Sequence, residues 1–266
     1  MPNHPISSLR SPHVERVKAL LSSRGKKVRR ERGEFVVDNL PAIFSAIKNR
    51  NPNFPSIKTL YYSESGLEKL THAVGEIPAG LESYLVTSEV LAQMADVESP
   101  QGVLAVAAQS KFDLAQIFKS SKKIAYFWQL QDPGNAGTVI RSADGCGFDA
   151  VLFSDESVDI YGPKVVRATV GSLWNIPVLE EISLSTLITF ATEYGYAIVA
   201  LDAKSEIDIA NVDKANKTIL VFGNEARGIP DLPNSVSLAA IPMRGKTESF
   251  NVASAATIAM YEVGLR

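Results

Sequence analysis

The second half of the chain alternates short, uninterrupted apolar runs with segments of helical periodicity. An uninterrupted apolar run predicts a strand buried on both faces, because a strand with one wet face alternates apolar and polar positions. Such strands, separated by helices, predict a parallel sheet with helices on both sides. The predicted strands are 124–130, 150–153, 176–179, 197–201, 218–222 and 238–241, and the predicted helices are 136–146, 163–170, 184–194 and 252–263.

The first half alternates shorter strands and helices, which predicts a smaller α/β domain. Residues 109–123 are mixed and polar, so we place a linker there. The predicted organisation is a first domain over 1–108 and a second domain over 124–266. In the first domain we predict strands at 35–37, 59–62, 83–87 and 101–108, and helices within 9–34 and at 41–48, 67–70 and 88–95.

Composition narrows the class of protein. Cys146 is the only cysteine, so an intramolecular disulfide is impossible and a cysteine-based metal site lacks ligands. No apolar run is long enough to cross a bilayer, and the basic N-terminal stretch lacks the apolar core of a secretion signal. We therefore expect a cytoplasmic protein with no metal ion and no membrane contact.

The net charge of −2 argues against a nucleic-acid partner, but the distribution of charge argues for one. Residues 10–32 carry nine Lys and Arg side chains against two Glu side chains. This cluster predicts contact with a polyanion, and a solvated, locally mobile segment is the alternative. The residues predicted to make the contact are Arg24, Lys26, Lys27, Arg29 and Arg30.

Three polar or glycine-rich segments follow predicted strands, namely 132–141, 223–228 and 243–251. Ligands of parallel α/β sheets bind beyond the carboxyl ends of the strands, so these segments are expected to converge on one site. In the third segment Ser249 and Asn251 are both candidates for the N-cap of the final helix.

Taken singly, each segment also has an ordinary explanation. Arg141 is either an arginine on the wet face of a helix or a phosphate ligand, since its planar guanidinium suits an anion. Gly223 lets a ligand approach the backbone and Glu225 can hold Arg141, or the two belong to a plain turn. Asn251 alone can be a helix cap and nothing more. The glycine spacing of dinucleotide-binding enzymes is missing, which argues against an ordinary doubly wound nucleotide enzyme.

Together the three segments resemble the signature motifs of the SpoU (TrmH-like) RNA ribose 2′-O-methyltransferases of the SPOUT superfamily. The first half is similar to the ribosomal-protein-like substrate-binding domain that many members carry, and Ser-Pro-Gln-Gly-Val at 99–103 is typical of its end. The matching residues are Asn135, Gly137, Arg141 and Ala143 in the first motif, Gly223, Glu225 and Gly228 in the second, and Ile241, Pro242, Met243, Gly245, Ser249, Asn251 and Val252 in the third.

The resemblance implies an α/β fold with a C-terminal trefoil-knotted SPOUT methyltransferase domain and a smaller N-terminal α/β substrate-binding domain. It implies S-adenosylmethionine as the cofactor, and a homodimer formed through the C-terminal helix, which is apolar and carries few charges over 252–263. The positions carried over are Gly223, Ile241, Met243 and Phe250 for cofactor binding, and Arg141, Glu225, Asn251, Asn135 and Ser249 for catalysis.

Under this hypothesis Arg141 binds a phosphate and stabilises charge on the ribose oxygen, Asn251 hydrogen-bonds the ribose, and Glu225 orients one of these two residues. The expected substrate is structured RNA, ribosomal rather than transfer RNA, because two-domain members of this size mostly resemble ribosomal enzymes. A non-catalytic RNA-binding module that keeps the fold is the other alternative, and the intact motifs argue against it.

Three positions depart from the family pattern. Phe250 stands where leucine is usual, Ala253 where serine is usual, and Asp38-Asn39 replaces a common Glu-Gly pair. None of the three changes falls on a position predicted to be catalytic.

Overall fold

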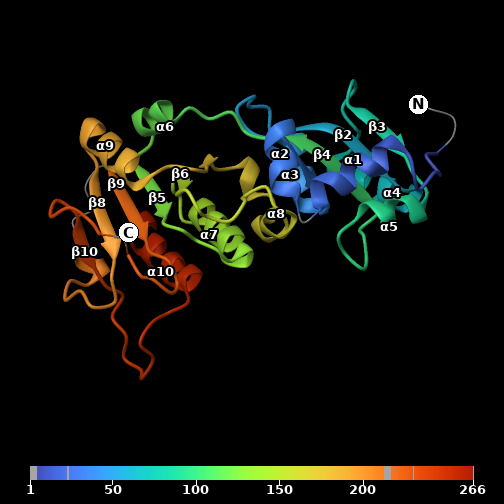
Figure 1. Cartoon of the computed structure of the whole chain (residues 1–266). Helices are drawn as coiled ribbons and strands as arrows, with labels where there is room; N and C mark the ends of the chain where they lie inside the picture. Colours follow the sequence, from blue (N-terminus) through green and yellow to red (C-terminus); the bar gives the residue numbers. More distant parts are fainter. Residues whose placement is uncertain (1–4, 23, 213–216, 230, 266) are drawn as a thin grey trace. The chain divides into compact units, whose positions relative to one another are not determined.

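The computed structural model describes residues 5–22, 24–212, 217–229 and 231–265. The chain forms two compact units (Figure 1). The first unit comprises Met1–Lys111 and Asp159–Asn175, and the second comprises Phe112–Val158 and Ile176–Arg266.

The second unit is built on a six-stranded sheet with the order β10-β8-β9-β5-β6-β7. Every neighbouring pair in it is parallel, which confirms the parallel sheet predicted from the apolar runs. Its strands are β5 (Lys123–Phe127), β6 (Ala150–Phe153), β7 (Val178–Leu179), β8 (Ala197–Leu201), β9 (Thr218–Phe222) and β10 (Ser237–Ala239).

Helices cover both faces of this sheet. Helices α6 (Leu114–Ser120) and α9 (Leu184–Tyr194) lie on one face, where they share a buried core with side chains of β5, β6, β8 and β9. Helices α7 (Pro133–Gly145) and α10 (Val252–Leu265) pack together on the other face (Figure 1). A short 3₁₀ helix, η2 (Ile209–Asn211), follows β8.

Several boundaries in the second unit differ from the sequence-based prediction: β5 ends at Phe127 and not at residue 130, and β7 begins at Val178 and not at residue 176. Two further differences concern α7 and α6. Helix α7 begins at Pro133, three residues before the predicted start at 136. The Asp132 carboxylate accepts a hydrogen bond from the Asn135 backbone N–H at 2.7 Å and thereby caps the helix. The stretch 109–123, predicted as a linker, contains α6, whose N-cap is Asp113.

The first unit has a four-stranded mixed sheet with the order β1-β4-β2-β3. Helices α1 and α5 bury apolar side chains against one face, and α3 and α4 contact strands of the same sheet. Its elements, apart from the segment treated next, are α1 (Pro12–Leu21), α2 (Gly25–Arg32), β1 (Glu34–Val37), α3 (Leu40–Lys48), β2 (Ser56–Tyr62), α4 (Glu64–Val74), β3 (Glu82–Leu85), α5 (Ser88–Met94) and β4 (Val103–Ala108).

A segment from the middle of the chain, Asp159–Asn175, folds as part of the first unit. It contains α8 (Pro163–Thr169) and the 3₁₀ helix η1 (Ser172–Trp174), which contact β1 and α3. The Trp174 indole N–H donates to the carbonyl oxygen of Pro55 at 2.8 Å. An ion pair joins Arg167 to Asp38 at 2.7 Å. The apolar pattern predicts the helix at 163–170 but carries no sign that it packs against the first half of the chain.

Arg29 belongs to this packing and not to the surface. Its guanidinium is buried and forms a 2.6 Å ion pair with Asp159, and it also donates to the backbone carbonyl of Leu20. A Cβ added at Gly25 would lie 2.4 Å from the Arg29 guanidinium, so glycine there makes room for the pair. Arg29 is therefore a structural residue, and including it among the predicted polyanion contacts is wrong.

Candidate active site

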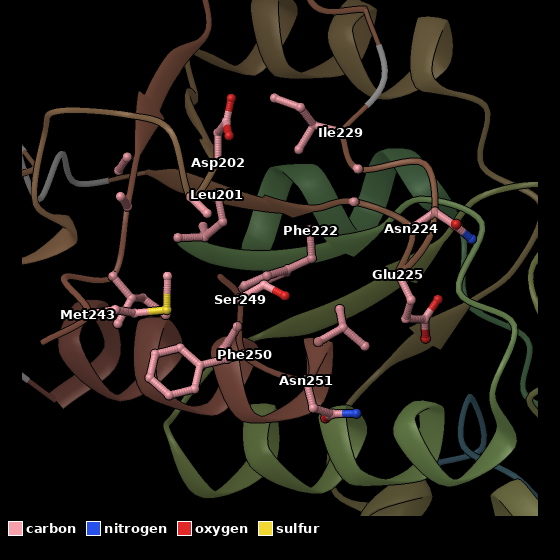
Figure 2. A pocket seen from close by; sticks show the side chains of 18 residues that line it. Leu201, Asp202, Phe222, Asn224, Glu225, Ile229, Met243, Ser249, Phe250 and Asn251 are labelled. Atoms are coloured by element: carbon pink, nitrogen blue, oxygen red, sulfur yellow. The ribbon is translucent and has the colours of Figure 1, made fainter. Parts of the chain in front are cut away.

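A cavity of about 440 Å³ opens at the carboxyl end of the parallel sheet (Figure 2). Its walls come from the segments that follow β8, β9 and β10 and from the first turn of α10. Two of the three predicted segments, 223–228 and 243–251, thus contribute to one cavity. The third segment, 132–141, reaches its edge through the hydrogen bonds of Asn135 described below.

The four predicted cofactor positions, Gly223, Ile241, Met243 and Phe250, all line the cavity. Figure 2 shows Met243 and the Phe250 ring on one side of it and Glu225 on the other. Sequence reasoning missed Asp202, which also lines the cavity. The signal for it is its position directly after β8, at the edge of the sheet where ligands of parallel sheets bind.

Gly223 is required by the protein's own backbone. A Cβ at this position would lie 2.3 Å from the carbonyl oxygen of Gly228, closer than any side chain can come. The turn is closed by two reciprocal backbone hydrogen bonds between Asn224 and Gly228, of 2.8 and 2.9 Å. The close approach of Gly228 therefore requires glycine at this position independently of any ligand.

One residue from each motif meets in a chain of hydrogen bonds. The Asn135 side-chain N–H donates to the Glu225 carboxylate at 3.1 Å. The Asn251 side-chain N–H donates to the Asn135 side-chain oxygen at 3.2 Å. Glu225 therefore holds Asn135, and through it Asn251. Among the described residues Glu225 makes no bond to Arg141, so of the two expected partners the arrangement fits Asn251, reached through Asn135, and not Arg141.

Asn251 has two structural tasks at once. Its side-chain oxygen accepts from the backbone N–H groups of Ala253 and Ser254, at 2.9 and 3.3 Å, which makes it the N-cap of α10. Its side-chain nitrogen points to Asn135. Ser249, the other candidate cap, is exposed and lines the cavity instead.

Arg141 lies apart from this cluster. Six residues advance an α-helix so that Asn135 and Arg141 point about 120° away from each other around α7. Arg141 is exposed, does not line the cavity, and makes no hydrogen bond or ion pair with any residue that the structure describes. Its neighbour Ser142 faces α10, where the Ser142 and Thr257 hydroxyls lie 2.7 Å apart.

The remaining predicted polyanion contacts lie on α2 in the first unit. Arg24, Lys27 and Arg30 are exposed, and Lys26 is half-buried. Lys27 pairs loosely with Glu31 one turn along, at 3.8 Å. Burial thus leaves four of the five predicted residues accessible to a partner.

The described part of the chain also bears on membrane and metal binding. None of its helices has both the length and the apolarity needed to cross a membrane. Nor do three His, Cys, Asp or Glu side chains gather anywhere in it in a way that could hold a metal ion.

Comparison with known protein families agrees with the three motifs. Residues 122–261 match the model of the SpoU rRNA methylase family, which is just over half of the chain. The chain belongs to the SpoU rRNA methylase family. In addition, residues 14–105 match the model of the MRM3-like substrate-binding domain, so this SpoU protein carries a substrate-binding domain ahead of its methylase domain.

Relatives of this SpoU protein share its length and fold. The 23S rRNA (guanosine(2553)-2′-O)-methyltransferase RlmP of Bacillus subtilis is 25% identical, over 97% of this chain and 99% of its own. A 23S rRNA (uridine(2479)-2′-O)-methyltransferase of Streptomyces viridochromogenes is 28% identical, over 95% of this chain and 89% of its own. The AdoMet-bound rRNA methyltransferase of Sinorhizobium meliloti has a TM-score of 0.83 at 28% identity, covering 98% of this chain and 97% of its own.

Proposed function

We propose that this protein transfers a methyl group from S-adenosylmethionine to the 2′-hydroxyl of a ribose in ribosomal RNA. The observation that carries the proposal is the bonded trio Asn135, Glu225 and Asn251 at the edge of a ligand-sized cavity. Full-length relatives that methylate 23S rRNA at a ribose support this choice of substrate, and an rRNA substrate puts the reaction in the cytoplasm.

The cavity suits the cofactor in size and chemistry. Pockets for ligands of this kind measure roughly 300–1,000 Å³ and combine apolar walls with a few polar groups. Here Ile241, Met243 and Phe250 supply apolar surface, while Gly223 and Asp202 supply backbone and carboxylate groups. When bound, S-adenosylmethionine supplies an electrophilic methyl group on its sulfonium sulfur. We infer that these residues hold it.

The protein's remaining task is to align a weak nucleophile with that methyl group. The Asn251 amide has two N–H donors, and Asn135 takes one of them. The other N–H is free to bind a ribose oxygen. Glu225 fixes the Asn135–Asn251 pair by accepting a hydrogen bond from Asn135. In this proposal Ser249, at the cavity wall, is a further contact for the ribose or its phosphate.

In this proposal Arg141 binds the sugar-phosphate backbone of the RNA. As the O–CH3 bond forms and the S–CH3 bond breaks, S-adenosylhomocysteine leaves and the hydroxyl proton passes to solvent water. A guanidinium stays protonated in proteins, so it does not take this proton, but it can bind a phosphate and stabilise negative charge developing on the ribose oxygen. Its exposure and lack of a partner among the described residues leave it available for this role.

The proposed homodimer uses α10, where Ile258 and Tyr261 are 40% and 50% exposed.

The decisive experiment separates Arg141 from the cofactor cavity. Arg141→Ala should lower methyl transfer from labelled S-adenosylmethionine about 10²–10³-fold, the usual effect of losing one charge-stabilising donor. The cofactor's Kd, measured by calorimetry, should stay within about twofold, because Arg141 does not line the cavity.

Arg141→Lys is the matched control, since it keeps the charge but loses the planar guanidinium. Its rate of methyl transfer should lie between those of the wild type and Arg141→Ala. Equal losses of cofactor binding and methyl transfer in Arg141→Ala would refute this division of roles. Mapping 2′-O-methyl groups in total RNA, with and without the gene, tests the substrate. If deleting the gene removed a 2′-O-methyl group from transfer RNA and none from ribosomal RNA, the proposed ribosomal RNA substrate would be wrong.

A further inference from the structure

Gln129 is a connecting residue at the edge of the active site that none of the three motifs contains. It follows β5 and has a φ of 49°, in the left-handed region that residues other than glycine seldom adopt. Such a conformation is strained and persists only where the surroundings impose it. At Gln129 the surroundings are hydrogen bonds to two neighbouring loops.

All four hydrogen-bonding groups of Gln129 are in use. The backbone N–H donates to the Ser154 hydroxyl at 2.7 Å, and the side-chain N–H donates to the Glu156 carboxylate at 2.8 Å. These two bonds reach the loop after β6. The backbone carbonyl accepts from the Asn224 amide at 2.7 Å, and the side-chain oxygen accepts from the Arg227 guanidinium at 2.9 Å. These two reach the turn after β9.

The second pair of bonds brackets Glu225. Asn224 and Arg227 flank it in the turn, and the Asn224 side-chain oxygen also accepts from the backbone N–H groups of Ala226 and Arg227, at 2.9 and 3.0 Å. Hydrogen bonds within the turn thus hold its own backbone, and Asn224 and Arg227 attach it to Gln129. Glu225 makes no other anchoring bond among the described residues apart from the one to Asn135.

We propose that Gln129 is a positioning residue for methyl transfer: it fixes the turn Asn224–Gly228, and so sets where Glu225 holds Asn135 and Asn251. The inference rests on the proposed function, since it assigns Gln129 to that reaction. Gln129 acts on the reacting ribose only through the Glu225 carboxylate. Removing the Gln129 side chain should therefore slow methyl transfer only while Glu225 is present.

The main test is Gln129→Ala, which removes the bonds to Arg227 and Glu156 and leaves the backbone bonds in place. We expect kcat with ribosomal RNA to fall about tenfold, because small misplacements of aligning groups cost one to two orders of magnitude. The Kd for S-adenosylmethionine should change less than about threefold, since the substitution loosens only the turn on one wall of the cavity and leaves Ile241, Met243 and Phe250 in place. The exposed Gln116→Ala on α6 is the matched control and should leave both quantities unchanged.

Two variants separate positioning from general damage. On a Glu225→Ala background, Gln129→Ala should lower kcat no further, because the residue through which it acts is already gone. The exchange Gln129→Glu with Glu156→Gln keeps an amide facing a carboxylate, so it should recover most of the activity that Gln129→Glu alone loses. Independent, additive losses in the first case, or no recovery in the second, would overturn the inference.

Hydrogen exchange gives a readout that does not depend on the reaction. In Gln129→Ala the backbone amides of Asn224 and Gly228, which close the turn, should exchange about tenfold faster, while those of β9 stay protected. Unchanged exchange in the turn, or faster exchange with an unchanged kcat, would overturn the inference. A wild-type protein that methylates no RNA would instead refute the proposed function, and the exchange result would still decide whether Gln129 fixes the turn.

Discussion

Arg29 and Arg24 lie on the same short basic stretch but meet opposite environments. Arg29 is 6% exposed and pairs with Asp159, whereas Arg24 is exposed at the start of α2. A buried charge is tolerated only when it is paired and hydrogen-bonded, and Arg29 meets this condition through Asp159 and the Leu20 carbonyl. Removing Arg29 leaves the largely buried Asp159 carboxylate without its cation, with the backbone N–H of Tyr161 as a donor.

We therefore predict that Arg29→Ala lowers the free energy of unfolding of the first unit by about 3–5 kcal/mol, the usual effect of breaking a buried pair. Arg24→Ala should change it by less than about 0.5 kcal/mol. Urea unfolding followed by Trp174 fluorescence measures this, on a Trp128→Phe background, because Trp174 is buried in the first unit and these are the two tryptophans of the chain. Equal effects of the two substitutions would show that the buried pair contributes nothing.

Elements of the second unit were predictable where local chemistry decides them. Helix α9 and strands β8 and β9 coincide with the predicted ranges, since apolar runs and the stop at Gly195, whose φ is 72°, are local signals. The start of α7 was predicted three residues too late, although Asp132 followed by proline is a local signal of a cap and a favoured first residue. The packing of α8 against β1 was not predictable, because periodicity reports which face of a helix is buried but not against what.

The same limit applies to the site. The position of the motifs after predicted strands predicts that the three segments converge, and hydrogen bonds join one residue from each, Asn135, Glu225 and Asn251. The sequence does not say which side chain bonds to which. The expectation was that Glu225 orients Arg141 or Asn251, and Glu225 bonds to Asn135, which in turn bonds to Asn251. Gln129 gave no signal at all, because its role depends on a backbone conformation and on four side chains distant in the sequence. The trefoil knot remains a prediction of the resemblance.

The contact between α7 and α10 supplies a prediction at the scale of elements. A Cβ at Gly264 would lie 2.2 Å from the backbone carbonyl oxygen of Cys146, which caps the end of α7. Gly264→Ala should therefore push the C-terminal ends of α7 and α10 apart. We expect a loss of about 1–3 kcal/mol, as for other overpacked contacts, which exceeds the gain of up to about 1 kcal/mol that alanine brings to a helix. Gly245→Ala, with open space around its Cβ, is the matched control. Thermal unfolding of both variants measures the difference, and a Gly264→Ala protein as stable as the control would contradict it.

At the scale of the whole molecule, charge and chemistry are assigned to different units. The net charge is only −2, yet the exposed cations of α2 all belong to the first unit, which carries the substrate-binding domain. The cavity and the motif residues belong to the second unit. We therefore expect the first unit to supply the salt-dependent part of RNA affinity and the second unit to supply the reaction.

Replacing Arg24 and Lys27 together by Ala should weaken RNA binding and reduce the slope of log K against log salt by about two, because each cation neutralises one phosphate of the RNA. The kcat at saturating RNA should stay unchanged. Lys119→Ala with Lys122→Ala removes the same charge from exposed positions of the second unit and should leave the slope as it was. Filter binding across a salt series gives both slopes, and identical slopes in the two variants would move the RNA contact away from α2.

The segment Asp159–Asn175 also dictates an order of events during translation. The first unit lacks this segment until the ribosome has made roughly sixty residues beyond Lys111, a delay of several seconds at roughly 5–20 residues per second. Strand β5, helix α7 and strand β6 are synthesised in that interval. Until Asp159 emerges, the nascent chain exposes an Arg29 without its carboxylate and a β1 face without its helix. A premature stop codon ahead of Trp174 would therefore damage the N-terminal half of the protein as well as the half that it deletes.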